Sequence, residues 1–194
     1  MTIDPLYVFV FAGLVTPGPN VILVTTSGAR FGLRRTWPHI AGIVVGVGVT
    51  SGVTALGVGA ALLAAPGLET ALKLVAVGWI LWMAWKLLTA RPGAAAERAR
   101  PFRFGEAVLF QWVNPKVWAV ALAATSGYAA DLPPAWEVAR IASAFAGINL
   151  FVCTFWTLAG TLLAYLLRTP AAWRAFTTAM AIALCASAVM VFVS

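Results

Sequence analysis

The stretch Thr16-Pro17-Gly18-Pro19-Asn20 lies in the middle of an apolar run that covers about residues 6–27. A proline inside a helix removes a backbone hydrogen bond and clashes with the preceding turn, so two prolines around a glycine argue against a continuous helix here. The backbone groups freed by such a break need partners from protein, water or a solute, because hydrocarbon offers none. The stretch therefore predicts a helix that is broken near its middle.

The composition of the chain indicates a lipid bilayer around that helix. Of the 194 residues, 62% are hydrophobic and 10% are charged, whereas soluble domains have about 45–50% and about 25%. The mean hydropathy is +0.93. Spans of about 20 residues each leave no room for a sizeable domain outside the membrane. This excludes soluble catalysis and argues against nucleic acid as a partner, despite a net charge of +7.

Hydropathy and charge predict an all-α membrane protein with six transmembrane helices. We place them at about residues 6–27, 39–64, 68–88, 105–127, 138–167 and 173–193. Ten of the 13 cations then fall on one side, which the positive-inside rule makes cytoplasmic. Both termini are expected on the periplasmic side. The first run lacks a basic segment before it, so we expect it to be kept as a span.

The chain is predicted to be a single transmembrane domain over residues 1–194, made of two halves. A linker at about 91–103, rich in Pro, Gly, Ala and Arg, separates residues 1–90 from residues 104–194. Three spans in each half give the halves opposite orientations, which predicts the 3+3 inverted repeat common among secondary transporters. The basic linker also suits contact with anionic membrane lipid.

A second proline motif, Asn114-Pro115-Lys116, lies in the middle of the fourth predicted span. A break there would place a helix N-terminus, which suits a carboxylate, deep in the membrane. Lys116 would cost at least about 2.5–3.5 kcal/mol at that depth and should face a cavity or a partner. We therefore predict one small-molecule site between the breaks, with substrate-binding residues Thr16, Pro17, Gly18, Pro19, Asn20, Asn114, Pro115 and Lys116. The alternative is structural: kinks that only shape the bundle, and a Lys116 bonded to a freed carbonyl, to Asn20 or to Asn114.

Three further residues are candidates for coupling or gating. Glu106 is the best-placed carboxylate for protons, although it also suits the first turn of a helix. Asn149 is polar at mid-depth and would either bond across helices or line a cavity. Arg30 would either set the topology or take part in a cytoplasmic gate. His39, at the start of the second span, and Asp4, before Pro5, are expected to be helix-start residues.

The sequence predicts neither an enzyme nor a metal or cofactor site. Cys153 and Cys185 lie in apolar stretches, and there is no Cys/His cluster. No serine has a histidine and a carboxylate near it in the pattern of a hydrolase. Two pairs of glycines spaced by four, Gly42/Gly46 and Gly48/Gly52, predict close helix packing within the bundle, or alternatively a homodimer interface.

At these motifs the sequence resembles the lysine and homoserine/threonine exporter family (LysE/RhtB). The resemblance includes Pro17-Gly18-Pro19, the run Gly28-Ala29-Arg30-Phe31-Gly32 that matches the family's G-x-R-x-G pattern, and Asn114-Pro115-Lys116. Phe104-Gly105 matches the family's F-x-x-G only loosely, and the third span departs from the family after Leu72-Lys73. The resemblance implies a bacterial inner-membrane exporter of amino acids or close derivatives, driven by the proton-motive force.

Other functions fit the residues as well. An exporter of another small solute or of a cation is the alternative within transport, although Lys116 argues against a bare cation. A membrane scaffold protein that transports nothing would use the glycine faces to bind its partner. A channel would show neither exchange nor coupling to protons.

Overall fold

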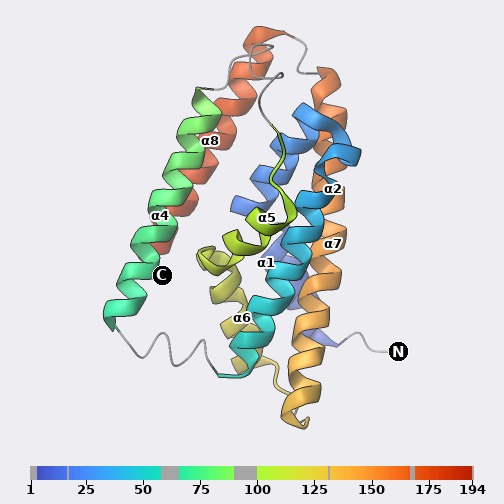
Figure 1. The fold of residues 1–194 in the computed structure, drawn as a ribbon, viewed down its shortest axis with the longest axis vertical. Helices are drawn as coiled ribbons and strands as arrows, with labels where there is room; N and C mark the ends of the chain where they lie inside the picture. The colour runs from blue at the N-terminus through green and yellow to red at the C-terminus, as the bar shows by residue number, and fades with distance from the viewer. Residues whose placement is uncertain are drawn as a thin grey trace.

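The computed structural model describes residues 4–16, 18–57, 66–89, 100–130, 132–166 and 169–193. They form seven helices and, within these ranges, no strand, as the predicted all-α class requires (Figure 1). The helices are α1 (Pro5–Val15), α2 (Pro19–Ala55), α4 (Pro66–Leu88), α5 (Phe104–Trp112), α6 (Pro115–Gly127), α7 (Pro134–Leu166) and α8 (Pro170–Val193). Most of the predicted linker, residues 90–99, and Pro17 of the first motif lie outside the described residues.

The first predicted span is broken where the proline motif predicts. Helix α1 ends at Val15, and both Thr16 (φ −62°, ψ 140°) and Gly18 (φ −168°, ψ −177°) are extended. The helix resumes at Pro19, so the break is shorter than the sequence suggests, and Asn20 belongs to the first turn of α2. Proline is favoured at this position because its fixed φ suits a helix and its missing N–H would have no partner there.

The fourth predicted span is broken in the same manner. Helix α5 ends at Trp112, and α6 begins at Pro115 after an extended Asn114. The two helices are bent by 62° relative to each other. Both breaks therefore share one pattern, an extended residue followed by a proline that starts the next helix.

Helix α2 is a hairpin of two helical arms, residues 19–31 and 33–55. Gly32 between them has φ 74° and ψ 169°, a backbone conformation open to glycine and strained for other residues. The hydroxyl oxygens of Ser27 and Thr36 are 2.8 Å apart, although nine residues of straight helix would separate them by about 13.5 Å. The first arm thus completes the first predicted span, and the second arm is the second predicted span. Figure 1 shows the chain turning back at this point.

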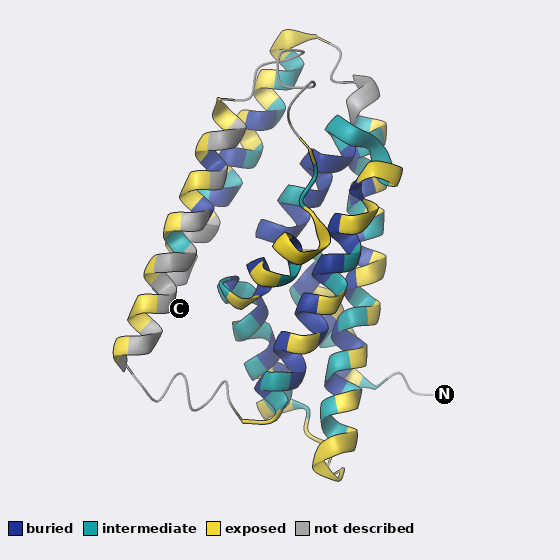
Figure 2. Cartoon of the chain, viewed as in Figure 1, coloured by how far each residue is buried: buried dark blue, intermediate teal, exposed yellow. Residues whose placement is uncertain are grey.

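Exposed residues lie along the outside of most helices (Figure 2). Many of them are large hydrophobic side chains, as a membrane protein requires, among them Leu109 and Leu162, which are at least 70% exposed. By length and composition, two described helices could cross a membrane, namely α2 and residues Pro134–Leu163 of α7, or three if α5 and α6 form one span. The full count of six spans stays a prediction.

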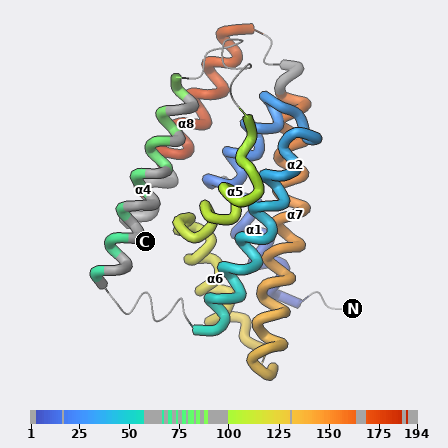
Figure 3. The backbone as a smooth tube through the Cα atoms, in the orientation of Figure 1, coloured from blue at the N-terminus to red at the C-terminus, as the bar shows by residue number. Residues whose placement is uncertain are grey.

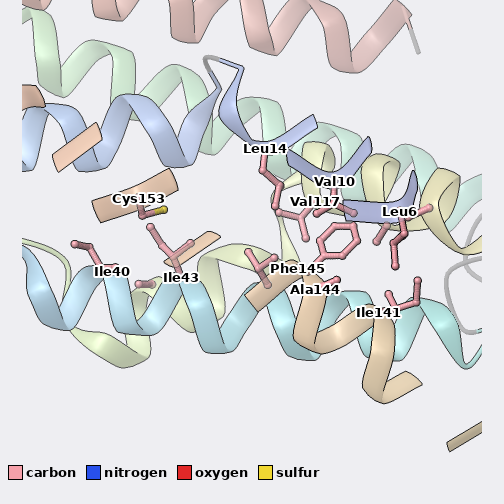
Figure 4. Close-up of a cluster of buried hydrophobic side chains, with 14 of the residues drawn as sticks. Leu6, Val10, Leu14, Ile40, Ile43, Val117, Ile141, Ala144, Phe145 and Cys153 are labelled. Carbon is pink, nitrogen blue, oxygen red and sulfur yellow. The ribbon is translucent and has the colours of Figure 1, made fainter. Parts of the chain in front are cut away.

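The main core lies between α1, the second arm of α2, α6 and α7. Leu6, Val10 and Leu14 are spaced by four and line one face of α1, where they are buried. They belong to one cluster of side chains with Phe145 of α7 and Val117 of α6 (Figure 4). This cluster packs α1, which ends at the first break, against α6, which begins after the second break.

Helices α4 and α8 pack against each other as a separate pair along one side of the bundle (Figure 3). A second cluster of buried side chains joins this pair to α5 and to the first arm of α2: Ile22, Ile80, Ala84, Phe110, Ala181 and Leu184. Helix α4 belongs to the first predicted half and α8 to the second. Each packing unit therefore contains helices from both halves of the sequence.

The predicted glycine pairs are packed inside the bundle, and they face two different helices. A Cβ on Gly46 would lie 2.7 Å from Gln111 Cγ and 2.9 Å from the carbonyl oxygen of Val108, so Gly42 and Gly46 pack on α5. Gly48 and Gly52 pack on the alanines of α7, where a Cβ would lie 3.3–3.4 Å from the nearest atom. This confirms packing within the bundle; the homodimer alternative stays a prediction.

A third glycine pair, which sequence reasoning missed, joins the first arm of α2 to α7. A Cβ on Gly28 would collide with the backbone of Thr157, and a Cβ on Gly160 would collide with the backbone of Thr25. Two glycines on different helices allow the two backbones to touch. Gly28 and Gly32 are the two glycines of the G-x-R-x-G run, so this motif provides one close helix contact and one chain reversal.

Candidate functional site

The two helix breaks face each other across a pair of buried amides. Asn20 Nδ2 donates to Gln111 Oε1 at 2.8 Å, and Gln111 Nε2 donates back to Asn20 Oδ1 at 3.2 Å. Gln111 also donates to the carbonyl of Ala107 at 2.9 Å and accepts from Asn114 Nδ2 at 3.3 Å. Gln111 and Asn114 are at most 1% exposed and Asn20 is 9% exposed. Asn20, just after the first break, is thus tied to the helix that precedes the second break and, through Gln111, to Asn114 within that break.

A lysine makes the second link between the breaks. Lys116 Nζ donates to the carbonyl oxygen of Thr16 at 2.6 Å and to its hydroxyl oxygen at 2.7 Å. The lysine stem passes over Gly18, where an added Cβ would lie 2.9 Å from Lys116 Cδ and 3.1 Å from Nζ. Any side chain at position 18 would therefore displace the lysine. The structural alternative expected Lys116 to bind a carbonyl freed by a helix break, and it does so at Thr16. This bond joins the two predicted motifs.

Tryptophan side chains satisfy the last carbonyl of the helix before each break. Trp156 Nε1 of α7 donates to the carbonyl of Val15 at 3.3 Å, where α1 ends. Trp118 Nε1 donates to the carbonyl of Trp112 at 3.0 Å, where α5 ends. A freed carbonyl in a membrane needs such a donor. The two breaks are therefore stable parts of the fold with similar hydrogen-bond partners.

Most of the predicted site residues meet at this junction. Thr16, Gly18 and Lys116 are in contact, and Asn20 and Asn114 both bind Gln111. Pro19 and Pro115 begin the helices that present them. Among the described residues, Asn114 Oδ1 is buried and has no hydrogen-bond partner. It is an acceptor that a bound solute with an N–H group would satisfy.

Gln111 is the residue of this junction that sequence reasoning missed. It is the hub of the amide cluster, since it makes hydrogen bonds to three other residues. The sequence contained one signal for it, because a glutamine three residues before Asn114 places a second amide one helical turn away in an apolar helix.

The interactions of the three coupling and gating candidates are with residues outside the junction. Glu106 binds Arg100 through two short contacts, at 2.5 and 2.7 Å, and accepts from the backbone N–H of Arg103 at 2.8 Å, as a first-turn acid does. This carboxylate raises the pKa of the Arg100 guanidinium above its usual range. Asn149 accepts from the thiol of Cys153, and within the described chain its Nδ2 is buried without a partner. Arg30 lies beside the turn of α2.

The described residues contain no group of three or more His, Cys, Asp or Glu side chains that could hold a metal ion. The chemistry available at the junction is therefore that of amides, a hydroxyl and an ammonium group. Such groups, together with two helix N-termini, are of the kind that hydrogen-bond polar solutes, and an ammonium group and helix N-termini attract anions.

Comparison with known proteins identifies the family. Residues 11–194 match the family of LysE type translocators. The chain is 32% identical over 168 residues, 84% of each chain, to the cysteine/O-acetylserine efflux protein of Salmonella typhimurium (strain LT2). Proteins of the same name are 30% identical over 76% of both chains in Klebsiella pneumoniae and 29% identical over about four fifths in Escherichia coli (strain K12). No solved structure matches the chain significantly. Because the match extends over almost the whole sequence, the chain belongs to the LysE type translocator family and is a transporter rather than an enzyme.

Proposed function

We propose that this protein exports an amino acid or a close derivative from the bacterial cytoplasm, using the proton-motive force and alternating access. The observation that carries the proposal is the junction of the two helix breaks, where Lys116 reaches Thr16 and Asn20 pairs with Gln111. In this topology six helices cross the inner membrane, and both termini lie on the periplasmic side.

The junction suits the carboxylate of an amino acid. Lys116 has three N–H donors, two of which bind Thr16 in this structure. A carboxylate can replace the Thr16 oxygens, since its full negative charge attracts the ammonium more strongly than a neutral oxygen does. The first turns of α2 and α6 begin beside it, at Pro19 and Pro115, and add the positive ends of two helix dipoles. The buried Asn114 Oδ1 is then available for the amino group.

When Lys116 exchanges Thr16 for a substrate carboxylate, substrate binding becomes coupled to movement of the two broken helices. With Thr16 released, the lysine no longer ties the first break to the second, and only the Asn20–Gln111 amide pair remains. Substrate binding would thus weaken the link between the two broken helices. The substrate would therefore favour the conformation in which the Lys116–Thr16 link is open. Alternating access requires that the ligand favours one conformation over another in this way.

The packing supports an inverted repeat. The second arm of α2 packs through Gly42 and Gly46 on α5, the helix before the second break. Gly160 of α7 packs on the first arm of α2, the helix that follows the first break. Each half thus covers the broken helix of the other, an arrangement typical of transporters with a site between repeats.

The proposed function is tested with purified protein in liposomes. The names of the relatives make O-acetyl-L-serine and L-cysteine the first substrates to test. We expect uptake of labelled substrate into vesicles that contain unlabelled substrate, and a Lys116→Gln protein should be about 10–100-fold slower, as loss of a charge-assisted bond of about 1.5–3 kcal/mol implies. Arg174→Gln is the matched control, since Arg174 is an exposed cation of α8.

Two further arms of the experiment separate this proposal from its alternatives. An imposed pH gradient should drive accumulation, and a protonophore should abolish it. Flux without exchange would indicate a channel. Full exchange activity of Lys116→Gln and of Asn20→Leu, both inserted at normal levels, would refute a substrate site at the helix breaks.

A further inference from the structure

A partly open cavity with several polar side chains in its wall lies at the other end of the first arm of α2, beside the chain reversal. Its volume is about 220 Å³, which equals about seven water molecules at ~30 Å³ each. This suits a small amino acid and is below the range of about 300–1,000 Å³ typical for drug-sized ligands. The walls come from both arms of α2, from Trp82 of α4 and from residues 100–102 before α5.

One side of this cavity carries hydrogen-bond donors that have no partner. Arg30 lines it and makes no ion pair or hydrogen bond to any described residue; its guanidinium lies 5.3 Å from the ring centre of Phe31. Arg100 also lines it but is held by Glu106. Arg30 is therefore the cation whose charge is uncompensated here, and its planar fork suits a carboxylate.

A buried histidine at the same cavity supports a polar ligand. His39 is 2% exposed and lines the cavity, and among the described residues neither of its ring nitrogens has a hydrogen-bond partner. A buried polar group without a partner costs about 1–3 kcal/mol. Phe102 packs against the ring at 5.0 Å between centres and supplies no hydrogen bond. The imidazole N–H is thus a second donor that a bound carboxylate would satisfy.

Two hydroxyl groups of the first arm of α2 provide hydrogen-bond acceptors at the same cavity. Thr26 donates its hydroxyl hydrogen to the carbonyl of Ile22 at 2.8 Å. Because Thr36 donates to the carbonyl of Gly32, the hydrogen between Ser27 and Thr36 belongs to Ser27. Thr26 and Ser27 have therefore used their hydrogens, and toward the cavity their oxygens offer lone pairs. Such acceptors suit an ammonium group.

We propose that this cavity is an entry site that binds the substrate as a zwitterion, with the carboxylate on Arg30 and His39 and the ammonium group on Thr26 and Ser27. The assignment of the ligand as a substrate rests on the proposed function. Ser27 lies seven residues beyond Asn20 on one helical arm, so the entry site is about 10 Å from the amide cluster. The cavity is on the side of the bundle that carries Arg34, Arg35 and Arg103, which the charge pattern assigns to the cytoplasm. A substrate thus binds first here and then moves along the arm to the helix breaks.

The test is equilibrium binding to the purified full chain in nanodiscs, which needs no transport. The probes are labelled O-acetyl-L-serine, L-serine and L-cysteine under reducing conditions. We expect Arg30→Gln to lower the affinity for these probes at least tenfold, whereas Arg34→Gln, an exposed cation that does not line the cavity, binds as the wild type does. The same comparison is made in the Lys116→Gln protein, in which the site at the helix breaks lacks its cation and exchange is about 10–100-fold slower. The tenfold effect of Arg30→Gln should persist there, so a failure of the transport proposal is seen separately.

A second variant addresses the ammonium end and guards against misfolding of the first. Thr26→Val keeps the shape and removes the acceptor. It should weaken binding of L-serine and leave unchanged the binding of 3-hydroxypropionate, which has a hydrogen in place of the amino group and so has no donor at that position. The proposal is overturned if none of the probes binds the wild type, if L-serine methyl ester competes as well as L-serine, or if Arg30→Gln and Arg34→Gln bind alike.

Discussion

The amide pair between the two helix breaks provides a prediction whose size follows from the structure. Asn20→Leu and Gln111→Met replace the two amides with apolar side chains of similar shape. Each single change leaves the other amide buried without its partner, while the double change removes both groups together. The double variant should therefore be destabilised by less than the sum of the two single variants.

The size of the difference follows from two hydrogen bonds, at 2.8 and 3.2 Å. Interhelical hydrogen bonds of membrane proteins contribute about 0.6 kcal/mol on average and up to ~1.7 kcal/mol. Two of them predict a coupling free energy of about 1–3 kcal/mol. The assay is reversible unfolding in mixed micelles, followed by circular dichroism, for the wild type, both single variants and the double variant.

A matched pair of residues provides the control. Asn149 is also a buried asparagine, but its hydrogen bond is to Cys153, whereas Asn20 pairs with Gln111. The free energies of Asn20→Leu and Asn149→Leu should add to within about 0.5 kcal/mol. Additivity of Asn20→Leu and Gln111→Met to the same precision would refute the argument that this pair holds the two breaks together.

The remaining predictions concern stability. Gly28→Ala should destabilise the protein by about 1–3 kcal/mol because its Cβ would meet the backbone of α7, whereas Gly147→Ala, in open space on α7, should be neutral or stabilising in thermal unfolding. The hydrogen bond from Arg140 holds the pKa of Asp4 below its usual range, so this carboxylate contributes stability above about pH 4 and loses it as the pH falls through the lowered pKa. The melting temperature of Asp4→Asn should thus depend less on pH below 4 than that of the wild type. Trp156→Phe leaves the last carbonyl of α1 without its donor and should lower the free energy of unfolding by about 1–3 kcal/mol; an unchanged midpoint would show that another donor replaces the indole.

The sequence predicted the helix breaks well because proline acts locally. Pro19 and Pro115 disrupt their own helices whatever surrounds them, and each begins a new helix as expected of a proline. Asp4 likewise accepts from the backbone N–H of Leu6, as predicted for a residue before a helix. Such local rules also gave the bounds of α4, α7 and α8 to within about four residues. The second span was predicted less well, at about 39–64, whereas the second arm of α2 covers residues 33–55.

The rest of the site depends on partners that are distant in sequence. Gln111 pairs with a residue 91 positions away, and Trp156 caps a carbonyl 141 positions away. No spacing rule links them. The same holds for Gly28 and Gly160, whose contact follows from how α2 lies on α7. His39 was expected at a helix start, but it lies within α2 and faces a cavity that only the folded chain forms.

The pairing of α4 with α8 has a consequence for how the protein is made. Helix α4 ends at Leu88, and its partner begins only at Pro170. At a synthesis rate of ~5–20 residues per second, the ribosome needs about 4–16 s to make the chain between them. During that time the face of α4 that later contacts α8 must rest against lipid or the insertion machinery. Helix α8 thus completes the wall of the bundle, and a chain stalled before it would leave one side of the transporter open to the bilayer.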